Sequence, residues 1–208
     1  MEGVNAAVFP MLQGGPHNNQ IGALAVAFKE ANTGEFRRYA QDVIANANAL
    51  AEGLKERGHV LATGGTDNHL ILWDVRPLGL TGSKVDKVLE LVGVTANKNS
   101  LPGDVSAINP GGVRLGTPAL TTRGLDRRDF ETVADLLDRG CRIALQIQNR
   151  AQLEVDALIA SGEESRKSNK VLLKDFDRVL NEDEDVQSQI QLLKGEVEDF
   201  SCQFYMPG

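Results

Sequence analysis

Residues 59–75, HVLATGGTDNHLILWDV, decide the fold class of this chain. The run 69–75 is rich in β-branched and aromatic residues, which favour extended strands, and 59–63 is a shorter candidate strand. Between them, the segment 64–68 holds the glycine, aspartate and asparagine residues that are typical of a turn. The stretch therefore predicts a β-hairpin in the middle of the fold.

Amphipathic helices are predicted on both sides of the hairpin. Before it, apolar residues recur at steps of four and three over 36–54, and Gly58 ends the pattern. After it, Ser83 is expected to cap the next helix. Further apolar stripes cover 85–92, 130–144 and 186–200, candidate strands cover 94–97 and 113–115, and a polar connection covers 161–170. Strands in the middle of the chain, with helices packed on one face, predict an α+β architecture.

A pair of glycines precedes another helical pattern near the start of the chain. The apolar run 8–13 leads into Gly14 and Gly15, and a helix capped by Asn18 or Asn19 follows. Bare glycines ahead of a helix start let backbone N–H groups converge on an anion, and phosphate suits such a site. A tight turn that needs glycine for its dihedral angles has the same sequence. The residues alone leave both interpretations open.

Two further tracts offer polar groups that could bind a ligand. Arg114 lies between Val113 and Leu115 in a short apolar strand, so it either faces solvent from an edge or enters a cleft, where it would bind a carboxylate. The tract 97–100, NKNS, offers amide groups that suit the edge of a heteroaromatic ring such as a pterin. Such a tract also satisfies an ordinary turn.

Composition and charge argue against several classes of protein. The 208 residues carry a net charge of −7, so no global positive field favours nucleic acid or an anionic membrane. The apolar runs are too short to span a bilayer. The two cysteines and three histidines share no metal-ligand spacing, and no catalytic nucleophile with a matching base stands out. No basic or apolar leader follows Met1, so no signal peptide is predicted. The chain begins abruptly, and we expect its first residues to belong to a larger protein.

Four tracts, in this order, resemble the C-terminal half of the eukaryotic-type serine hydroxymethyltransferase family, also called glycine hydroxymethyltransferase. They are AVFPMLQGGPHN at 7–18, DNHL at 67–70, NKNS at 97–100 and RLGTPA at 114–119. The resemblance covers nearly the whole chain and implies a pyridoxal-phosphate enzyme of fold type I. Residues 1–31 would then end the large cofactor domain, and 32–208 would form the small C-terminal domain, an antiparallel or mixed sheet packed with helices.

The resemblance also implies roles for individual residues. Gly14 and Gly15 match the loop that contacts the cofactor phosphate from the neighbouring subunit of a dimer. Arg114 matches the arginine that binds the amino-acid carboxylate, and Asn99, with its neighbours, matches the segment that lines the folate pocket. The loop 101–112 does not align cleanly with bacterial members. The tract that holds the family's aldimine lysine is absent, so we assign no catalytic residue and no metal ligand.

As a whole, the resemblance implies the interconversion of serine and tetrahydrofolate with glycine and methylenetetrahydrofolate, with pyridoxal phosphate as cofactor. The parent enzyme would be a homo-oligomer, either a dimer or a tetramer, that binds serine, glycine and folate but neither nucleic acid nor membrane. Its compartment would be the cytoplasm, with the mitochondrion as the alternative. Two other functions stay open: a noncatalytic truncated paralogue that binds or modulates full-length subunits, and a folate-independent pyridoxal-phosphate aldolase.

Overall fold

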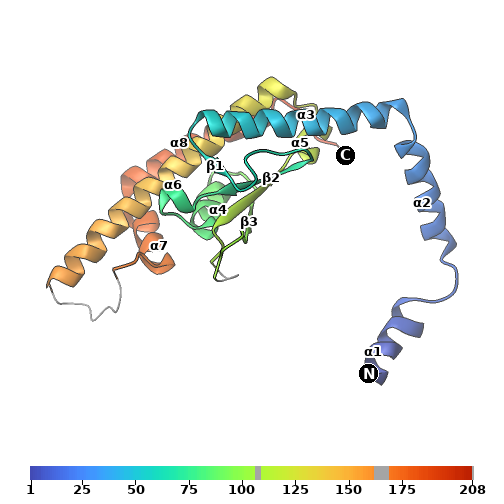
Figure 1. Ribbon diagram of the computed structural model, residues 1–208, viewed down its shortest axis with the longest axis horizontal. Coiled ribbons are helices and arrows are strands. Elements are labelled where there is room, and N and C mark those ends of the chain that lie inside the picture. Colours follow the sequence, from blue (N-terminus) through green and yellow to red (C-terminus); the bar gives the residue numbers. More distant parts are fainter. Residues whose placement is uncertain (106–108, 162–168, 208) are drawn as a thin grey trace. The chain divides into compact units, whose positions relative to one another are not determined.

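The computed structural model describes residues 1–105, 109–161 and 169–207, and it divides into two compact units. Unit 1 is Met1–Gln41 and unit 2 is Asp42–Gly208. The helix α3 (Gly34–Glu56), predicted from its apolar periodicity, begins in unit 1 and continues into unit 2 (Figure 1). Gly58 follows it with a positive φ of 85°, a conformation that glycine adopts easily, so the expected helix stop is confirmed.

Unit 1 is helical and buries none of its apolar helix face. Its elements before α3 are α1 (Glu2–Ala6), the irregular π-helical segment η1 (Ala7–Leu12) and α2 (Asn18–Ala31). His17, rather than Asn18 or Asn19, occupies the N-cap position of α2. No residue of α2 is buried, and Phe28 is 70% exposed. The domain boundary expected after residue 31 coincides with the end of α2 and stays a prediction.

Unit 2 contains a four-stranded antiparallel sheet. Its strands are β1 (Val60–Leu61), β2 (Leu70–Asp74), β3 (Asn97–Asn99) and β4 (Gly112–Gly116), in the spatial order β1-β2-β4-β3. The predicted hairpin is confirmed as β1 and β2, with Leu61 opposite Trp73. The strand expected at 94–97 begins later, because the N–H of Val94 donates to the carbonyl of Leu89 and still belongs to the end of the preceding helix.

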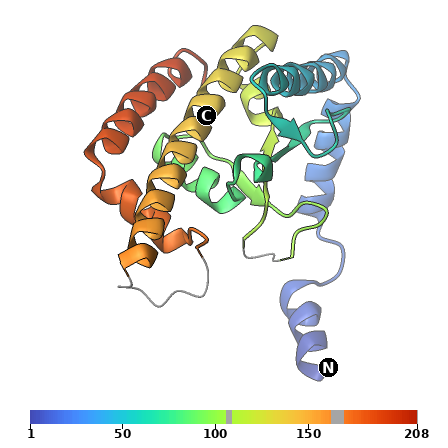
Figure 2. The same cartoon turned by 60° about the vertical axis from the view of Figure 1, so that its left-hand side comes forward.

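Helices pack beside this sheet and against one another. They are α4 (Gly82–Leu91), α5 (Pro118–Thr122), α6 (Arg127–Ser161), α7 (Leu173–Glu182) and α8 (Glu184–Ser201), with a 3₁₀ turn η2 (Arg76–Leu78). The long helix α6 packs against α4, α7 and α8 (Figure 2). Thr81, not Ser83, holds the N-cap position of α4. Of the expected connection 161–170, residues 162–168 lie outside the described ranges.

The hydrophobic core lies between the sheet and the helices. Burial alternates along β2 and β4, so that Ile71, Trp73, Val113 and Leu115 are buried on the same face. Trp73 is 0% exposed, and its ring lies edge-on to His59, with 4.8 Å between the centroids. Each such large apolar side chain stabilises the fold by about 1.5–3 kcal/mol relative to an exposed one. The predicted α+β class is confirmed.

Candidate functional site

Arg114 lies on an inner strand of the sheet. In the ladder it is opposite Leu72 of β2 on one side and Asn97 of β3 on the other. Its neighbours Val113 and Leu115 point into the core, and Arg114, on the other face of β4, is exposed. β4 is not an edge strand, and Arg114 is among the residues that line a pocket; that it binds a carboxylate there stays a prediction.

The Arg114 pocket has a volume of about 520 Å³. Its polar lining includes His69, Asn97 and Arg114, and its apolar lining includes Leu120 and Val133. Within the described ranges, no carboxylate pairs with the Arg114 guanidinium and no hydrogen bond engages it. A guanidinium with five N–H donors and no partner among the described residues is suited to a small carboxylate, which accepts two parallel hydrogen bonds.

Buried hydrogen bonds fix the corner that follows Arg114. Thr117 is fully buried, its N–H donates to the carbonyl of His69 at 3.1 Å, and its Oγ1 donates to the carbonyl of Val43 in α3 at 2.9 Å. From the same helix, Asn46 Nδ2 donates to Thr121 Oγ1 at 3.0 Å. The turn from β4 into α5 is thus attached to α3, and this attachment holds the C-terminal end of β4 in place.

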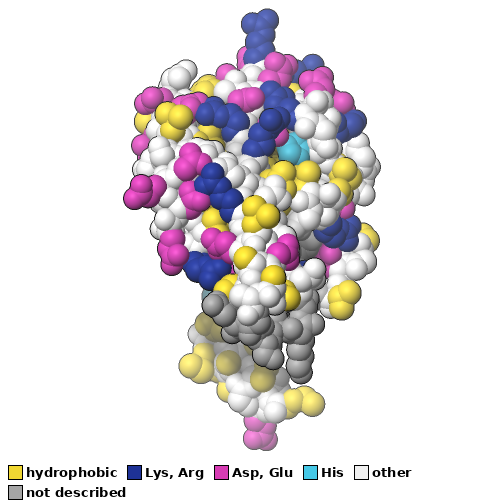
Figure 3. Space-filling model, turned by 90° about the vertical axis from the view of Figure 1, so that its left-hand side faces the viewer, with side chains coloured by type: hydrophobic (Ala, Val, Ile, Leu, Met, Phe, Trp, Pro, Cys, Tyr) yellow, Lys and Arg dark blue, Asp and Glu magenta, His cyan; other side chains and the backbone are white. Residues whose placement is uncertain are grey.

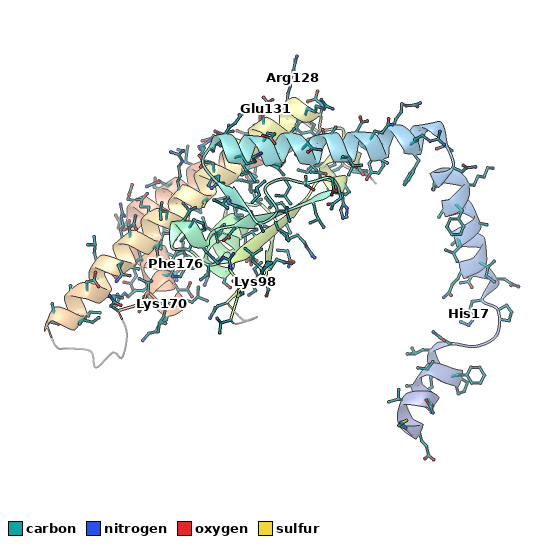
Figure 4. The ribbon with its side chains drawn as sticks, viewed as in Figure 1. His17, Lys98, Arg128, Glu131, Lys170 and Phe176 are labelled. Carbon is teal, nitrogen blue, oxygen red and sulfur yellow. The ribbon has the colours of Figure 1, made fainter. Side chains whose placement is uncertain are left out.

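The amide tract lies on β3, beside Arg114. Asn99 pairs with Gly112 and its Nδ2 donates to the carbonyl of Ser100 at 2.7 Å, whereas Asn97 pairs directly with Arg114. Asn97 lines the pocket and Asn99 does not. The sequence pointed to Asn99 for the folate pocket, which stays a prediction, whereas strand register, which is not visible in a tract of four residues, places Asn97 opposite Arg114. Lys98, between the two amides, is exposed on the edge strand (Figure 4).

The two glycines near the start of the chain line a pocket within unit 1. It has a volume of about 430 Å³ and includes Gly14, Gly15, His17 and Gln20. The first turn of α2 has no side-chain cap, so its N–H groups are available to a ligand. A Cβ added at Gly15 would meet open space, and one at Gly14 would lie 3.3 Å from His17 Nε2. These features fit a phosphate group held by backbone N–H donors.

Two buried nucleophilic side chains, Cys141 and Lys84, are unsuited to covalent chemistry at the Arg114 pocket. Burial raises the pKa of the Cys141 thiol to about 12, so it stays protonated and unreactive. Lys84 is buried on α4, where its Nζ donates to Gln148 and to the carbonyl of Val171, and it does not line the pocket. No lysine lines this pocket in the part of the chain that the structure describes.

Arg123, the residue that follows α5, makes contacts that the sequence did not predict. Its Nε donates to the carbonyl of Tyr205 at 3.1 Å, and its Nη2 donates to the carbonyls of Phe204 and Ser201, at the end of α8. Arg123 also lines a second pocket of about 350 Å³, which shares Thr95, Gly116 and other residues with the Arg114 pocket. The acceptors lie about 80 positions away along the chain and are backbone groups, so no sequence signal could have identified them.

The remaining surface shows mixed charge. On the face in Figure 3, basic and acidic side chains are interspersed without a broad patch of one sign. Among the described residues, no three His, Cys, Asp or Glu side chains are grouped as a metal site. In the same described ranges, no helix combines the length and apolar character needed to cross a membrane.

The sequence is similar to known proteins of one family. A family model described as serine hydroxymethyltransferase matches residues 1–137. Serine hydroxymethyltransferase 4 of Arabidopsis thaliana is 49% identical over 99% of this chain, which corresponds to 39% of that protein. The cytosolic serine hydroxymethyltransferase of Oryctolagus cuniculus is 45% identical over 99% of this chain and 39% of its own length.

A third relative, named putative serine hydroxymethyltransferase, mitochondrial, comes from Neurospora crassa. It is 56% identical over 72% of this chain, which corresponds to 28% of that protein. The chain therefore spans at most about two fifths of the length of these three relatives. With a family model that matches well over half of its residues and relatives that match nearly all of them, the chain belongs to the serine hydroxymethyltransferase family.

Proposed function

We propose that this chain supplies the part of a pyridoxal-phosphate-dependent serine hydroxymethyltransferase that binds the carboxylate of serine or glycine. The observation that carries the proposal is Arg114, a residue of an inner strand that is among those lining a pocket, with a guanidinium that has no acidic partner among the described residues. Because arginine keeps its charge at every physiological pH, such a group favours an anionic ligand.

Each residue has a distinct role in this proposal. Arg114 binds the amino-acid carboxylate and so orients the substrate, which is a contribution of proximity rather than of proton transfer. Asn99 and its neighbours face tetrahydrofolate, the acceptor of the one-carbon unit. Gly14 and Gly15 hold the cofactor phosphate through backbone N–H groups. When bound, pyridoxal phosphate supplies an electron-accepting ring for the electron pair released from serine.

The glycine loop would serve the cofactor of a neighbouring subunit, so we propose a homo-oligomer, either a dimer or a tetramer, as the active assembly. We propose the cytoplasm as its compartment, with the mitochondrion as the alternative. The name of the Oryctolagus cuniculus relative includes the word cytosolic, and that of the Neurospora crassa relative includes the word mitochondrial.

The proposal is tested by titrating the isotope-labelled chain with serine and, separately, with serine methyl ester, which lacks the carboxylate. We expect serine to shift the amide resonances of Arg114 and its ladder partner Asn97, and we expect the ester to leave them in place. The variant Arg114→Gln should lose the response to serine. Arg128→Gln is the matched control, because Arg128 is an exposed arginine at the start of α6 (Figure 4).

Equal responses to serine and its ester, or an unchanged response in Arg114→Gln, would overturn the assignment of Arg114. The phosphate role is tested separately, since inorganic phosphate should shift the amide resonances of Gly14 and Gly15 in unit 1. Their failure to respond would remove the cofactor role of the glycine loop.

A further inference from the structure

A second arginine, Arg76, lies between two carboxylates at the end of β2. Its Nε donates to Asp74 Oδ1 at 2.9 Å and its Nη2 to Asp74 Oδ2 at 2.7 Å. Its Nη1 donates to Asp104 Oδ1 at 3.2 Å and to the carbonyl of Pro102 at 3.0 Å. One guanidinium therefore connects the strand β2 to the segment that follows β3.

Asp104 uses its other oxygen to join both ends of that segment. Oδ2 accepts the N–H of Leu101 at 2.8 Å and the N–H of Gly111 at 2.7 Å. Leu101 lies two residues after β3 ends, and Gly111 immediately precedes β4. The backbone hydrogen bonds from Gly111 and Leu101, with the nearby Arg76, lower the pKa of the Asp104 carboxyl, so the group is ionised at neutral pH.

The packing around Gly111 leaves no room for a side chain. A Cβ there would lie 2.4 Å from Arg76 Cδ and 2.7 Å from Asp104 Oδ1. Two backbone hydrogen bonds add to the closure, from the N–H of Val75 to the carbonyl of Gly111 at 3.2 Å and from the N–H of Gly82 to the carbonyl of Pro110 at 2.8 Å. The start of β4 is thus fixed against β2 and α4.

This closure lies directly beside the site residues. Asn99 is opposite Gly112, and Arg114 is opposite Asn97, so the pairing of β3 with β4 determines how Asn99 stands relative to Arg114. Arg114 is also held from its other side by Thr117, which hydrogen-bonds to α3. Asn99, on a three-residue edge strand, has no comparable second attachment in its ladder.

We propose that Arg76 and Asp104 are positioning residues for the folate-facing side of the site. Together they form a loop clamp, Arg76 with Asp104, that holds Asn99 opposite Gly112, two positions along β4 from Arg114, without touching a substrate. The inference rests on the proposed function, because the position of Asn99 matters only if Asn99 faces folate as proposed. Lysine cannot replace Arg76, since a single ammonium group does not reach two carboxylates and a carbonyl in fixed directions.

The test uses the complete chain and the variants Arg76→Gln and Arg76→Lys. Arg178→Gln is the matched control, because Arg178 forms a similarly exposed ion pair with Glu154, with side-chain exposures of 40% for Arg178 and 39% for Arg76. Two quantities are measured: hydrogen exchange of the Leu101 and Gly111 amides, and the affinities for folinate and for serine from resonance shifts.

Both Arg76 variants should speed exchange at Leu101 and Gly111 by about tenfold or more, the effect of losing one charge-assisted hydrogen-bond network. They should weaken folinate binding by about fivefold or more while serine affinity changes less than about twofold, since Thr117 still attaches the end of the Arg114 strand to α3. The control should change none of these quantities. This split between two ligands is the readout that a purely structural role would not produce.

Three results would overturn the clamp. These are unchanged exchange in Arg76→Gln, full rescue by Arg76→Lys, and equal losses of folinate and serine affinity. Failure of the proposed function looks different. If folinate shifts no resonance near Asn99 in the unsubstituted chain, the folate role of Asn99 fails and the clamp loses its function, whatever the exchange rates show.

Discussion

Lys84 places a charge inside the protein. It is only 5% exposed, and its Nζ lies 5.6 Å from the centre of the Phe176 ring, which Figure 4 labels on α7. Burial lowers the pKa of the Lys84 ammonium from 10.5 to about 8; the charge of Lys170 acts in the same direction and that of Asp175 opposes it. In its charged form Lys84 connects α4 to α6 and to the segment before α7, but its buried ammonium group loses its contact with water.

This shift predicts how stability depends on pH. Between pH 8 and 10.5 the unfolded chain still holds the Lys84 proton while the folded chain has lost it, so the free energy of unfolding rises with pH in this window. Relative to Lys84→Met, the gain should reach about 3 kcal/mol. Urea unfolding at several pH values measures it. Parallel pH profiles for the two proteins would contradict the prediction.

Replacing glycine by alanine should change the free energy of unfolding in opposite directions at two positions, Gly82 and Gly195. A Cβ at Gly82 would lie 2.1 Å from the carbonyl oxygen of Gly112, a backbone atom of β4 that cannot move away. Gly82→Ala should therefore lower the free energy of unfolding by about 2–3 kcal/mol. Gly195→Ala, on α8 where nothing lies within 4 Å, should raise it by about 0.5–1 kcal/mol. Denaturant titration distinguishes the two, and equal effects would refute the packing argument.

Among the helices, the C-terminal end of α8 depends on the side chain of Arg123, the residue that caps the C-terminal end of α5. Arg123 donates to the carbonyl of Ser201, the last residue of α8, and to those of Phe204 and Tyr205 just after it, where a helix end leaves carbonyl groups without partners inside the helix. Arg123→Met should lower stability by about 1–2 kcal/mol and speed amide exchange in the last turn of α8. Arg128→Met is the control. Unchanged exchange in residues 198–205 would show that Arg123 does not hold this end.

The helices and the hairpin were predictable because their signals are local. The periodic apolar stripes over 36–54 and 186–200 predict α3 and α8 to within a few residues, and the turn residues between β1 and β2 predict the hairpin. The start of β3 was misplaced, because the helix-ending bond from Val94 to Leu89 competes with strand pairing and leaves no mark in composition.

The site was predictable only in part. A charged residue within an apolar strand identifies Arg114, since burying its neighbours forces it to the other face. The pairing with Asn97, the buried hydrogen bond of Thr117 to α3 and the contacts of Arg76 with Asp104 join residues that lie far apart along the chain. These depend on sheet order and register, which a single sequence does not specify.

For the whole molecule, the apolar surface of unit 1 has a measurable consequence. Leu24 and Phe28 of α2 are 55% and 70% exposed, and apolar surface of this kind favours association. We expect light scattering to show an apparent mass that rises with protein concentration. The double variant Leu24→Gln and Phe28→Gln should reduce the rise of apparent mass with concentration. Leu192→Gln, at an exposed leucine of α8, should leave that rise unchanged. A monomer at every concentration would contradict the prediction.

The chain alone should not catalyse the proposed reaction. No lysine lines the Arg114 pocket within the described ranges, so the lysine attachment of pyridoxal phosphate that the family resemblance implies has no group to form it there. With pyridoxal phosphate, serine and tetrahydrofolate added, we expect no glycine above the level of the protein-free mixture. Formation of glycine that depends on the protein would contradict this prediction and would show that the chain is active by itself.

The single tryptophan of the chain has a practical use. Trp73 is fully enclosed between the sheet and the helices and lies edge-on to an imidazole. Its fluorescence emission therefore moves to longer wavelength only when the interior of unit 2 opens to solvent, and unit 1, which has no tryptophan, contributes nothing to the signal. The protein carries a built-in optical probe that can follow the melting of one unit separately from the other.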